Sequence, residues 1–205
     1  MNIIVVPQYI GGLIFDCDGT LVDSMPLHMS AWEHTITSHG GKWEPEFFAA
    51  KKGMPEERIV GLYNRHYGVS FDPGETVRAK HAFFRAHPGG FKPIPHVIDV
   101  VRRYRGILPM AVASGGVRDN VDLELRALGI QDCFQAIVTA DDDIRPKPSP
   151  EIFLEAARQI GVAPELCQVF EDGDLGLEAA RKAGMLATDV RLTLTYADRT
   201  PTHAE

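Results

Sequence analysis

The stretch that decides the fold of this chain is Phe15-Asp16-Cys17-Asp18-Gly19-Thr20-Leu21-Val22-Asp23. The apolar run at residues 12–15 predicts a short buried strand. Two carboxylates follow it, and a strand that ends in charge places that charge at the sheet edge where ligands bind in α/β folds. Two acids at this spacing repel each other unless a cation or a shared proton intervenes. Taken alone, however, the pair is better explained as a solvated acidic turn. The choice between this explanation and a ligand site depends on the rest of the chain.

The composition is that of an ordinary globular protein with a hydrophobic core. Of the 205 residues, 44% are hydrophobic and 24% are charged, and the length fits one domain or one domain with a modest insertion. The net charge of −7 argues against non-specific binding to nucleic acid or to anionic membranes. The apolar residues 1–6 are too few for a signal peptide or a membrane span, and Pro7 breaks the run. We expect a cytoplasmic monomer or weak dimer with no nucleic-acid or membrane partner.

The three cysteines, Cys17, Cys133 and Cys167, predict neither a disulfide framework nor a zinc site. Their number is odd, and no Cys-x-x-Cys or Cys/His ligand spacing occurs. Such cysteine usage is typical of the reducing cytosol. Cys17 lies between the two acids of the opening stretch, and strand alternation directs its side chain away from them, so we expect it in the core.

From residue 93 onward the chain alternates between strand-like and helix-like segments. Alternation of this kind predicts a parallel sheet covered by helices, the doubly wound, Rossmann-like α/β fold. The strand at residues 12–15 belongs to the same sheet. Further strands are predicted at residues 110–113, 136–138, 168–170 and 187–190, with apolar residues at helical spacing between them.

Between residues 25 and 92 the pattern changes to helices alone. Three helices are predicted here, beginning near Met25, Pro55 and Pro73, because apolar residues recur at helical spacing after these positions. This block interrupts the α/β pattern directly after the acidic stretch, at the sheet edge where such folds place their function. The sequence therefore predicts a core domain of residues 1–24 and 93–205 and an inserted small helical cap of residues 25–92.

Each predicted core strand ends in a group that can take part in chemistry. Ser114-Gly115-Gly116 follows one strand, Lys147 lies in the loop after another, and Glu171-Asp172 follows a third. Because the carboxyl ends of parallel strands meet at one edge, we expect these groups to form one pocket with Asp16 and Asp18. Carboxylates suit Mg²⁺, and a serine with backbone N–H groups at a helix start suits an anion. Each group alone also has a simpler explanation: an acidic helix start, a serine N-cap or a surface lysine.

The order of these groups resembles the four motifs of the haloacid dehalogenase superfamily, and the resemblance covers nearly the whole chain. The chain is similar in particular to the β-phosphoglucomutase-like branch, which carries a small helical cap after the first motif. Residues 53–59 and 109–112 are similar to the fructose-1-phosphate phosphatase members of that branch. The residues that carry the resemblance are Asp16-Cys17-Asp18-Gly19-Thr20, Ser114, Lys147-Pro148 and Glu171-Asp172-Gly173-Asp174.

The resemblance implies catalytic roles for the acids of the opening stretch. Asp16 would be the nucleophile, which attacks phosphorus in its ionised form and becomes an aspartyl-phosphate. Asp18 would protonate the leaving oxygen and then activate water, a role that requires a raised pKa so that Asp18 holds a proton at neutral pH. The Thr20 hydroxyl would orient this loop.

The resemblance also implies how the phosphoryl group and the metal are held. Ser114, Gly115 and Lys147 would bind the transferring phosphoryl group, and Lys147 would also balance the charge of Asp16. The cofactor would be Mg²⁺, which neutralises the phosphate so that one anion can approach another. Its ligands would be Asp16, Asp18 through its backbone carbonyl, Glu171 and Asp172.

The cap is expected to choose the substrate, and its candidate contacts are His28, Arg58 and Lys80. A solvated surface side chain explains each of them equally well. The resemblance implies a Mg²⁺-dependent phosphatase of a small sugar phosphate, such as fructose 1-phosphate or another hexose phosphate. A phosphomutase with the same nucleophile is the alternative, although mutase-like sequences carry a basic residue soon after the Lys-Gly of the cap, where this chain has Glu56 after Lys52-Gly53. A catalytically silent protein of the same fold would show a damaged motif, and none is visible.

Overall fold

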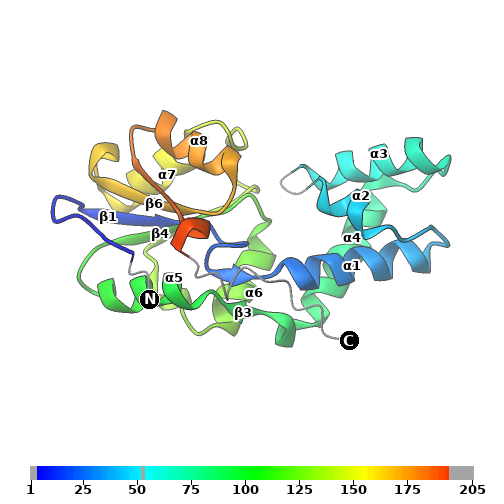
Figure 1. Ribbon diagram of the computed structural model, residues 1–205, viewed down its shortest axis with the longest axis horizontal. Helices are drawn as coiled ribbons and strands as arrows, with labels where there is room; N and C mark the ends of the chain where they lie inside the picture. Colours follow the sequence, from blue (N-terminus) through cyan, green and yellow to red (C-terminus); the bar gives the residue numbers. More distant parts are fainter. Residues whose placement is uncertain (1–3, 52–53, 194–205) are drawn as a thin grey trace.

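The structure, a computed structural model, describes residues 4–51 and 54–193 of the chain. Figure 1 shows two groups of elements side by side: a sheet with helices on both of its faces, and a separate group of helices at one end. The separate helices come from residues 25–86, and the sheet comes from the sequence on either side of them. This arrangement confirms the predicted α/β fold with an inserted helical block.

The sheet of the described residues has the strand order β5-β4-β1-β6-β7, and every neighbouring pair is parallel. From central β1 the chain proceeds outward to β5 and then returns to the other side of β1. In open α/β sheets, ligands bind beyond the carboxyl ends of the strands at such a reversal. The strands are β1 (Gly12–Phe15), β4 (Met110–Ala113), β5 (Ala136–Val138), β6 (Cys167–Glu171) and β7 (Leu186–Asp189).

The two faces of β1 contact two different cores, because side chains alternate along a strand. Leu13 and Phe15 pack with residues of α5 (Pro95–Tyr104) and α6 (Arg118–Ala127). Ile14 packs on the opposite face with residues of α7 (Glu151–Ile160) and α8 (Asp174–Lys182). Burial on both faces explains why this strand is an unbroken apolar run rather than an alternating one.

The separate helices have a hydrophobic cluster of their own, built around Trp32, Phe48 and Tyr63. Phe48 belongs to a five-residue helix that the sequence pattern did not predict, because so short a helix shows no helical periodicity. Its ring centroid lies 5.1 Å from that of Trp32. The helices are α1 (Met25–Ser38), α2 (Pro45–Ala49), α3 (Glu56–Tyr67) and α4 (Pro73–Ala86).

A small antiparallel ribbon joins the helical block to the sheet. It pairs β2 (Val22–Asp23) with β3 (Lys92–Pro93), so the chain enters and leaves the helical block at neighbouring points. Two-residue strands carry no periodicity, and for this reason the sequence did not predict them. The boundaries expected at residues 24 and 93 fall on this ribbon, and we propose the division into a core of 1–24 and 93–205 and a cap of 25–92 as the domain organisation.

Three smaller observations complete the fold. The cysteines Cys17, Cys133 and Cys167 are buried and free. None of the helices in the described part of the chain is long and apolar enough to cross a bilayer. Short 3₁₀ helices lie at η1 (Pro88–Gly90), η2 (Gln131–Cys133), η3 (Pro164–Leu166) and η4 (Val190–Thr193).

Replacement of Leu13 by alanine tests the central position of β1. Leu13 is fully buried, so Leu13→Ala is expected to lower the free energy of unfolding by about 2–5 kcal/mol through lost burial and a cavity. Urea unfolding followed by circular dichroism measures this change. The control is Ile107→Ala, at a side chain that is 69% exposed, which is expected to cost less than about 0.5 kcal/mol. Equal losses in the two variants would contradict the assignment of β1 to the core.

Candidate active site

Three of the predicted site segments meet at one edge of the sheet, where β1, β4 and β6 end. Asp16 follows β1 directly, and its backbone N–H donates to the carbonyl of Phe170 on β6 at 3.0 Å. Ser114 follows β4, and Glu171 is the last residue of β6. The parallel pairing of the strands therefore produces the common edge that the sequence predicted.

Asp16, Lys147, Glu171 and Asp172 form one cluster at this edge. Carboxylate oxygens of the three acids lie within 4.8 Å of one another. The Lys147 ammonium donates to Asp16 Oδ1 at 2.7 Å and to Glu171 Oε1 at 2.6 Å. These four residues were predicted from the sequence to share one pocket, and the structure brings them together.

Two glycines make room for the carboxylates of this cluster. A Cβ atom at Gly176 would overlap with the carboxylate of Glu171, and one at Gly19 would overlap with that of Asp172. Gly19 also has a φ of 86°, a backbone conformation that residues other than glycine rarely adopt. Sequence reasoning gave Gly176 no role, although its place just beyond Glu171-Asp172, in the first turn of α8, was a usable signal.

The donor set fits a divalent cation. Burial raises the pKa of Asp16 well above its ordinary range, the nearby carboxylates of Glu171 and Asp172 raise it further, and the ammonium of Lys147 opposes them only in part. The protein's own groups therefore disfavour the ionised form of Asp16 that a nucleophile requires. Three oxygen donors beside a single ammonium suit a hard cation such as Mg²⁺, whose charge would favour the ionised carboxylates.

Lys147 keeps its proton in this cluster. Burial lowers the pKa of its ammonium, but the charges of Asp16 and Glu171 and the hydrogen bonds to them raise the pKa above its usual range. The ammonium therefore balances part of the negative charge, as the sequence predicted.

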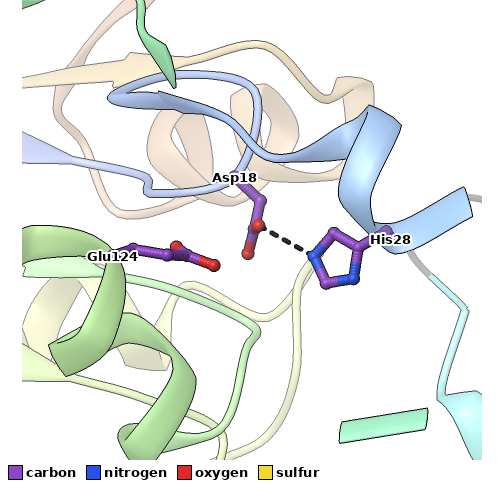
Figure 2. Close-up of side chains that lie close together, drawn as sticks. All are labelled: Asp18, His28 and Glu124. Atoms are coloured by element: carbon purple, nitrogen blue, oxygen red, sulfur yellow. Dashed lines mark hydrogen bonds and ion pairs between the residues drawn. The ribbon is translucent and has the colours of Figure 1, made fainter. Parts of the chain in front are cut away.

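The side chain of Asp18 is directed away from that cluster. Its Oδ1 accepts hydrogen bonds from the Ser24 hydroxyl and from His28 Nε2, the latter at 3.0 Å. Figure 2 shows this pair, with the carboxylate of Glu124 on the opposite side of Asp18. The carboxylate of Asp18 is therefore not placed as a ligand of the Asp16 cluster, and a role for its backbone carbonyl stays a prediction.

The protonation of Asp18 differs from the expectation. Burial raises the pKa of this carboxyl, but the hydrogen bond from His28, with further help from Ser24 and Lys80, lowers it to about 2. The prediction of a raised pKa is thus wrong for this arrangement. Its cause lies in the tertiary structure, because Ser24 and His28 turn back onto a single oxygen of Asp18.

Glu124 is a buried acid that sequence reasoning missed. It lies on α6, is 1% exposed, and accepts a hydrogen bond from the thiol of Cys17 at 2.9 Å. Burial, together with the charge of Asp18, raises the pKa of Glu124 to about 9, so it is neutral at pH 7. The usable signal was an acid placed within the apolar stripe of Val121 and Leu125. Cys17 itself is fully buried, as predicted.

Ser114 and Gly115 shape a loop rather than a helix start. The Ser114 hydroxyl is buried and accepts a hydrogen bond from the backbone N–H of Gly116 at 3.0 Å. α6 begins only at Arg118, so Ser114 does not cap this helix. Gly115 is exposed, and a Cβ placed on it would meet nothing within 4 Å. A small anion can therefore approach the backbone at this point.

The Thr20 hydroxyl has no hydrogen-bond partner among the described residues, although it is buried. The turn around it is closed by the backbone, through N–H groups of Gly19 and Leu21 that donate to the carbonyls of Val22 and Cys17 at 2.8 and 2.9 Å. The expected role of Thr20 in orienting the loop stays a prediction.

The three candidate residues of the cap lie in two different places. Arg58 lines a cavity of about 270 Å³ together with Met54, Lys147 and Leu175, so it faces the cluster across the space between helical block and sheet. His28 and Lys80 instead form a hydrogen bond with each other, and Lys80 is 0% exposed. Neither is a solvated surface side chain, and the burial of Lys80 favours a role in positioning over direct contact with substrate.

The pKa of Glu124 predicts how stability depends on pH. Between about pH 5 and pH 9 the folded chain holds a proton on Glu124 that the unfolded chain has released, so the free energy of unfolding falls as pH rises through this range. Glu124→Gln keeps an acceptor for Cys17 and removes the titration, so its stability is expected to fall less steeply. Urea unfolding at pH 5, 7 and 9 measures the slope. The exposed Glu178→Gln is the control, and identical slopes for Glu124→Gln and the parent would refute the assignment.

Comparison with known proteins identifies the family of the chain. The sequence pattern of the haloacid dehalogenase-like hydrolases matches residues 10–184. The fructose-1-phosphate phosphatase YqaB of Escherichia coli K12 is 38% identical over 182 residues, which cover 88% of this chain and 96% of that protein.

Solved structures agree with this match. CbbY from Rhodobacter sphaeroides, in complex with phosphate, has a TM-score of 0.77 and 28% identity, covering 87% of this chain and 84% of its own. The β-phosphoglucomutase of Clostridium difficile has a TM-score of 0.75 and 25% identity, covering 88% of this chain and 84% of its own. The chain is therefore an enzyme of the haloacid dehalogenase-like hydrolase family.

Proposed function

We propose that this enzyme is a Mg²⁺-dependent phosphatase that hydrolyses a small sugar phosphate, such as fructose 1-phosphate or another hexose phosphate, through an aspartyl-phosphate. The observation that carries the proposal is the pairing of Lys147 with Asp16 and Glu171 at the carboxyl edge of the sheet. The similarity to a fructose-1-phosphate phosphatase over 88% of the chain supports the class of substrate.

In this mechanism Asp16 is the nucleophile. Lys147 holds one carboxylate oxygen of Asp16, which leaves the other free to attack phosphorus. The oxygens of the transferring phosphoryl group bind to Lys147 and to the loop at residues 114–116, where charge develops in the transition state. Asp16, Glu171 and Asp172 would hold Mg²⁺, which supplies the positive charge that lets one anion approach another.

Asp18 donates a proton to the leaving group and later accepts one from water. Its Oδ2 lies on the side of the phosphoryl loop, since a Cβ on Gly116 would be 3.5 Å from this oxygen and 3.2 Å from Ser114 Oγ. As a carboxylate, Asp18 is ready to take a proton from the water that hydrolyses the aspartyl-phosphate. For the first step it needs a proton, and the negative charge of a bound phosphate raises the pKa of a neighbouring carboxyl in the required direction.

The cavity between the helical block and the sheet suits a small phosphorylated molecule. Its volume is about 270 Å³, and Arg58 and Lys147 line it from opposite sides, so both can bind oxygens of an anionic substrate. A phosphomutase with the same nucleophile is the alternative, in line with the similarity to β-phosphoglucomutase. The Lys52-Gly53 pair that bears on this choice lies outside the described residues.

Replacement of the nucleophile tests the proposal. The parent enzyme is expected to release phosphate from hexose phosphates only with Mg²⁺, and Asp16→Asn is expected to lower kcat by about 10⁴-fold or more, because the amide cannot form the aspartyl-phosphate. A phosphate-release assay over a panel of sugar phosphates, with Mg²⁺ or with a chelator, measures both effects. The exposed Asp132→Asn, on the surface next to Arg105, should retain the parent activity. Dependence on a sugar bisphosphate, with little net release of phosphate, would favour the mutase instead.

Replacement of Gly176 by alanine tests the metal site. A Cβ at this position would displace the Glu171 carboxylate, so Gly176→Ala is expected to weaken Mg²⁺ binding by about 10-fold or more. Isothermal titration with Mg²⁺ measures this affinity without any substrate. Gly89→Ala, where a Cβ meets nothing within 4 Å, is the matched control and should bind Mg²⁺ like the parent. Unchanged affinity in Gly176→Ala would exclude Glu171 as a ligand.

A further inference from the structure

A chain of hydrogen bonds runs from Asp18 into the helical block and ends on two residues to which the proposed function gives no role. His28 on α1 bonds to Asp18 through Nε2 and to the Lys80 ammonium through Nδ1, at 3.0 and 2.7 Å. Lys80, on α4, also donates to Glu56 Oε1 at 2.5 Å. The second oxygen of Glu56 bonds to His81 Nε2 at 2.6 Å. Glu56 opens α3, so three helices converge on this chain.

Glu56 is the carboxylate that balances a buried ammonium. Lys80 is 0% exposed and lies near the rings of Trp32 and Phe84, at 5.7 and 5.3 Å from their centroids. A buried charge without a partner is costly, and aromatic faces compensate only part of that cost. Burial raises the pKa of Glu56, but the hydrogen bond from His81 and the charge of Lys80 lower it to about 2, so Glu56 stays ionised.

The ammonium of Lys80 determines which nitrogen of His28 carries the proton. An ammonium has three N–H donors and no acceptor, so Nδ1 of His28 must accept. With Nδ1 as an acceptor, the ring carries its proton on Nε2, which can donate to Asp18 Oδ1. The ring is held in this orientation by stacking on Phe84, at 4.4 Å between centroids.

The consequence for Asp18 is a fixed orientation. Its Oδ1 receives two hydrogen bonds, from Ser24 and His28, while Oδ2 lies on the side of Gly116 and Ser114. If Nε2 of His28 lost its proton, this nitrogen and Oδ1 would both be acceptors and would repel each other. Asp18 would then lose one of the two bonds that direct Oδ2 toward the phosphoryl loop.

We propose that Glu56 is a positioning residue that acts through Lys80 on the tautomer of His28, and thereby holds Asp18 in the orientation needed for proton transfer to the leaving group. The inference rests on the proposed phosphatase function and deepens it. His81 takes part by holding the second oxygen of Glu56.

The test compares leaving groups that need a proton with one that does not. Glu56→Gln keeps the size of the side chain and removes its charge. For fructose 1-phosphate, whose alkoxide must be protonated as it leaves, kcat/KM is expected to fall about 10-fold or more, since this ratio reports the step in which the leaving group departs. For p-nitrophenyl phosphate, whose phenolate leaves without a proton, kcat/KM is expected to change less than about 3-fold, because kcat/KM does not include the later attack of water and the general acid contributes little to this leaving group. The neighbouring Glu57→Gln, on the exposed side of the same helix turn, is the matched control and should match the parent on both substrates.

Distinct outcomes separate the inference from the proposed function. An equal fall on both substrates, or no fall on either, overturns the role of Glu56, whereas a parent enzyme that releases no phosphate from any sugar phosphate overturns the proposed function instead. In a Lys80→Met background, Glu56→Gln is expected to have no further effect on kcat/KM for fructose 1-phosphate, and additive losses overturn the route through Lys80.

A spectroscopic measurement on the parent protein needs neither substrate nor a folded variant. The ¹⁵N shifts of labelled histidine are expected to show His28 with its proton on Nε2, and a proton on Nδ1 overturns the inference. Glu56→Gln, where folded, is expected to lose this single tautomer, and Glu57→Gln to keep it.

Discussion

The arrangement of the site depends on one largely buried ammonium, that of Lys147, between the carboxylates of Asp16 and Glu171. These three residues come from the end of β1, from the loop after β5 and from the end of β6, so the ammonium joins three segments that are far apart in the sequence. A buried carboxylate without a partner would be strongly disfavoured, and one ammonium offsets only part of the charge of three acids. The remaining charge is the physical reason that this edge suits a cation.

The two acids of the first motif have separate surroundings, although they are only two residues apart. Asp16 faces a concentration of negative charge, and Asp18 faces donors that stabilise its ionised form. The turn at Gly19 lies between the two environments, and the absence of a Cβ at Gly19 lets the backbone pass close to Asp172. The proposed nucleophile and the proposed proton carrier therefore have their charge states set by different parts of the molecule, the first by the sheet edge and the second by the helical block.

The central strands and the cluster around Asp16 could be predicted from the sequence, for identifiable physical reasons. The strands β1, β4 and β5 have the predicted bounds, because burial on both faces makes each an unbroken apolar run between turns. The meeting of Asp16 with Lys147, Glu171 and Asp172 follows from parallel strands alone. Motif spacing was enough for this part of the site, since each residue stands at a strand end or in the loop beyond it.

The remaining features of the site depend on contacts between distant segments, which local sequence patterns do not encode. Glu56 and Lys80 are 24 residues apart and meet only because α3 packs against α4. The pKa of Asp18 was predicted in the wrong direction because it depends on a hydrogen bond from His28. That hydrogen bond forms only through the orientation of α1 relative to the ribbon of β2 and β3. The short helix α2 was missed because it has no periodic signature of its own, and the role of Glu124 was missed because its partner Cys17 is 107 residues away in the sequence.

The ribbon of β2 and β3 has a consequence for how such an enzyme can change over time. Because the chain departs from the sheet and comes back to it at adjacent points, the intervening segment can be lengthened, shortened or exchanged without disturbing the strand order. The groups proposed to act on phosphorus stay in place while the helical segment between β2 and β3 varies. Under the proposed function, changes in the helical block can therefore alter substrate selection while the reaction at the sheet edge stays the same.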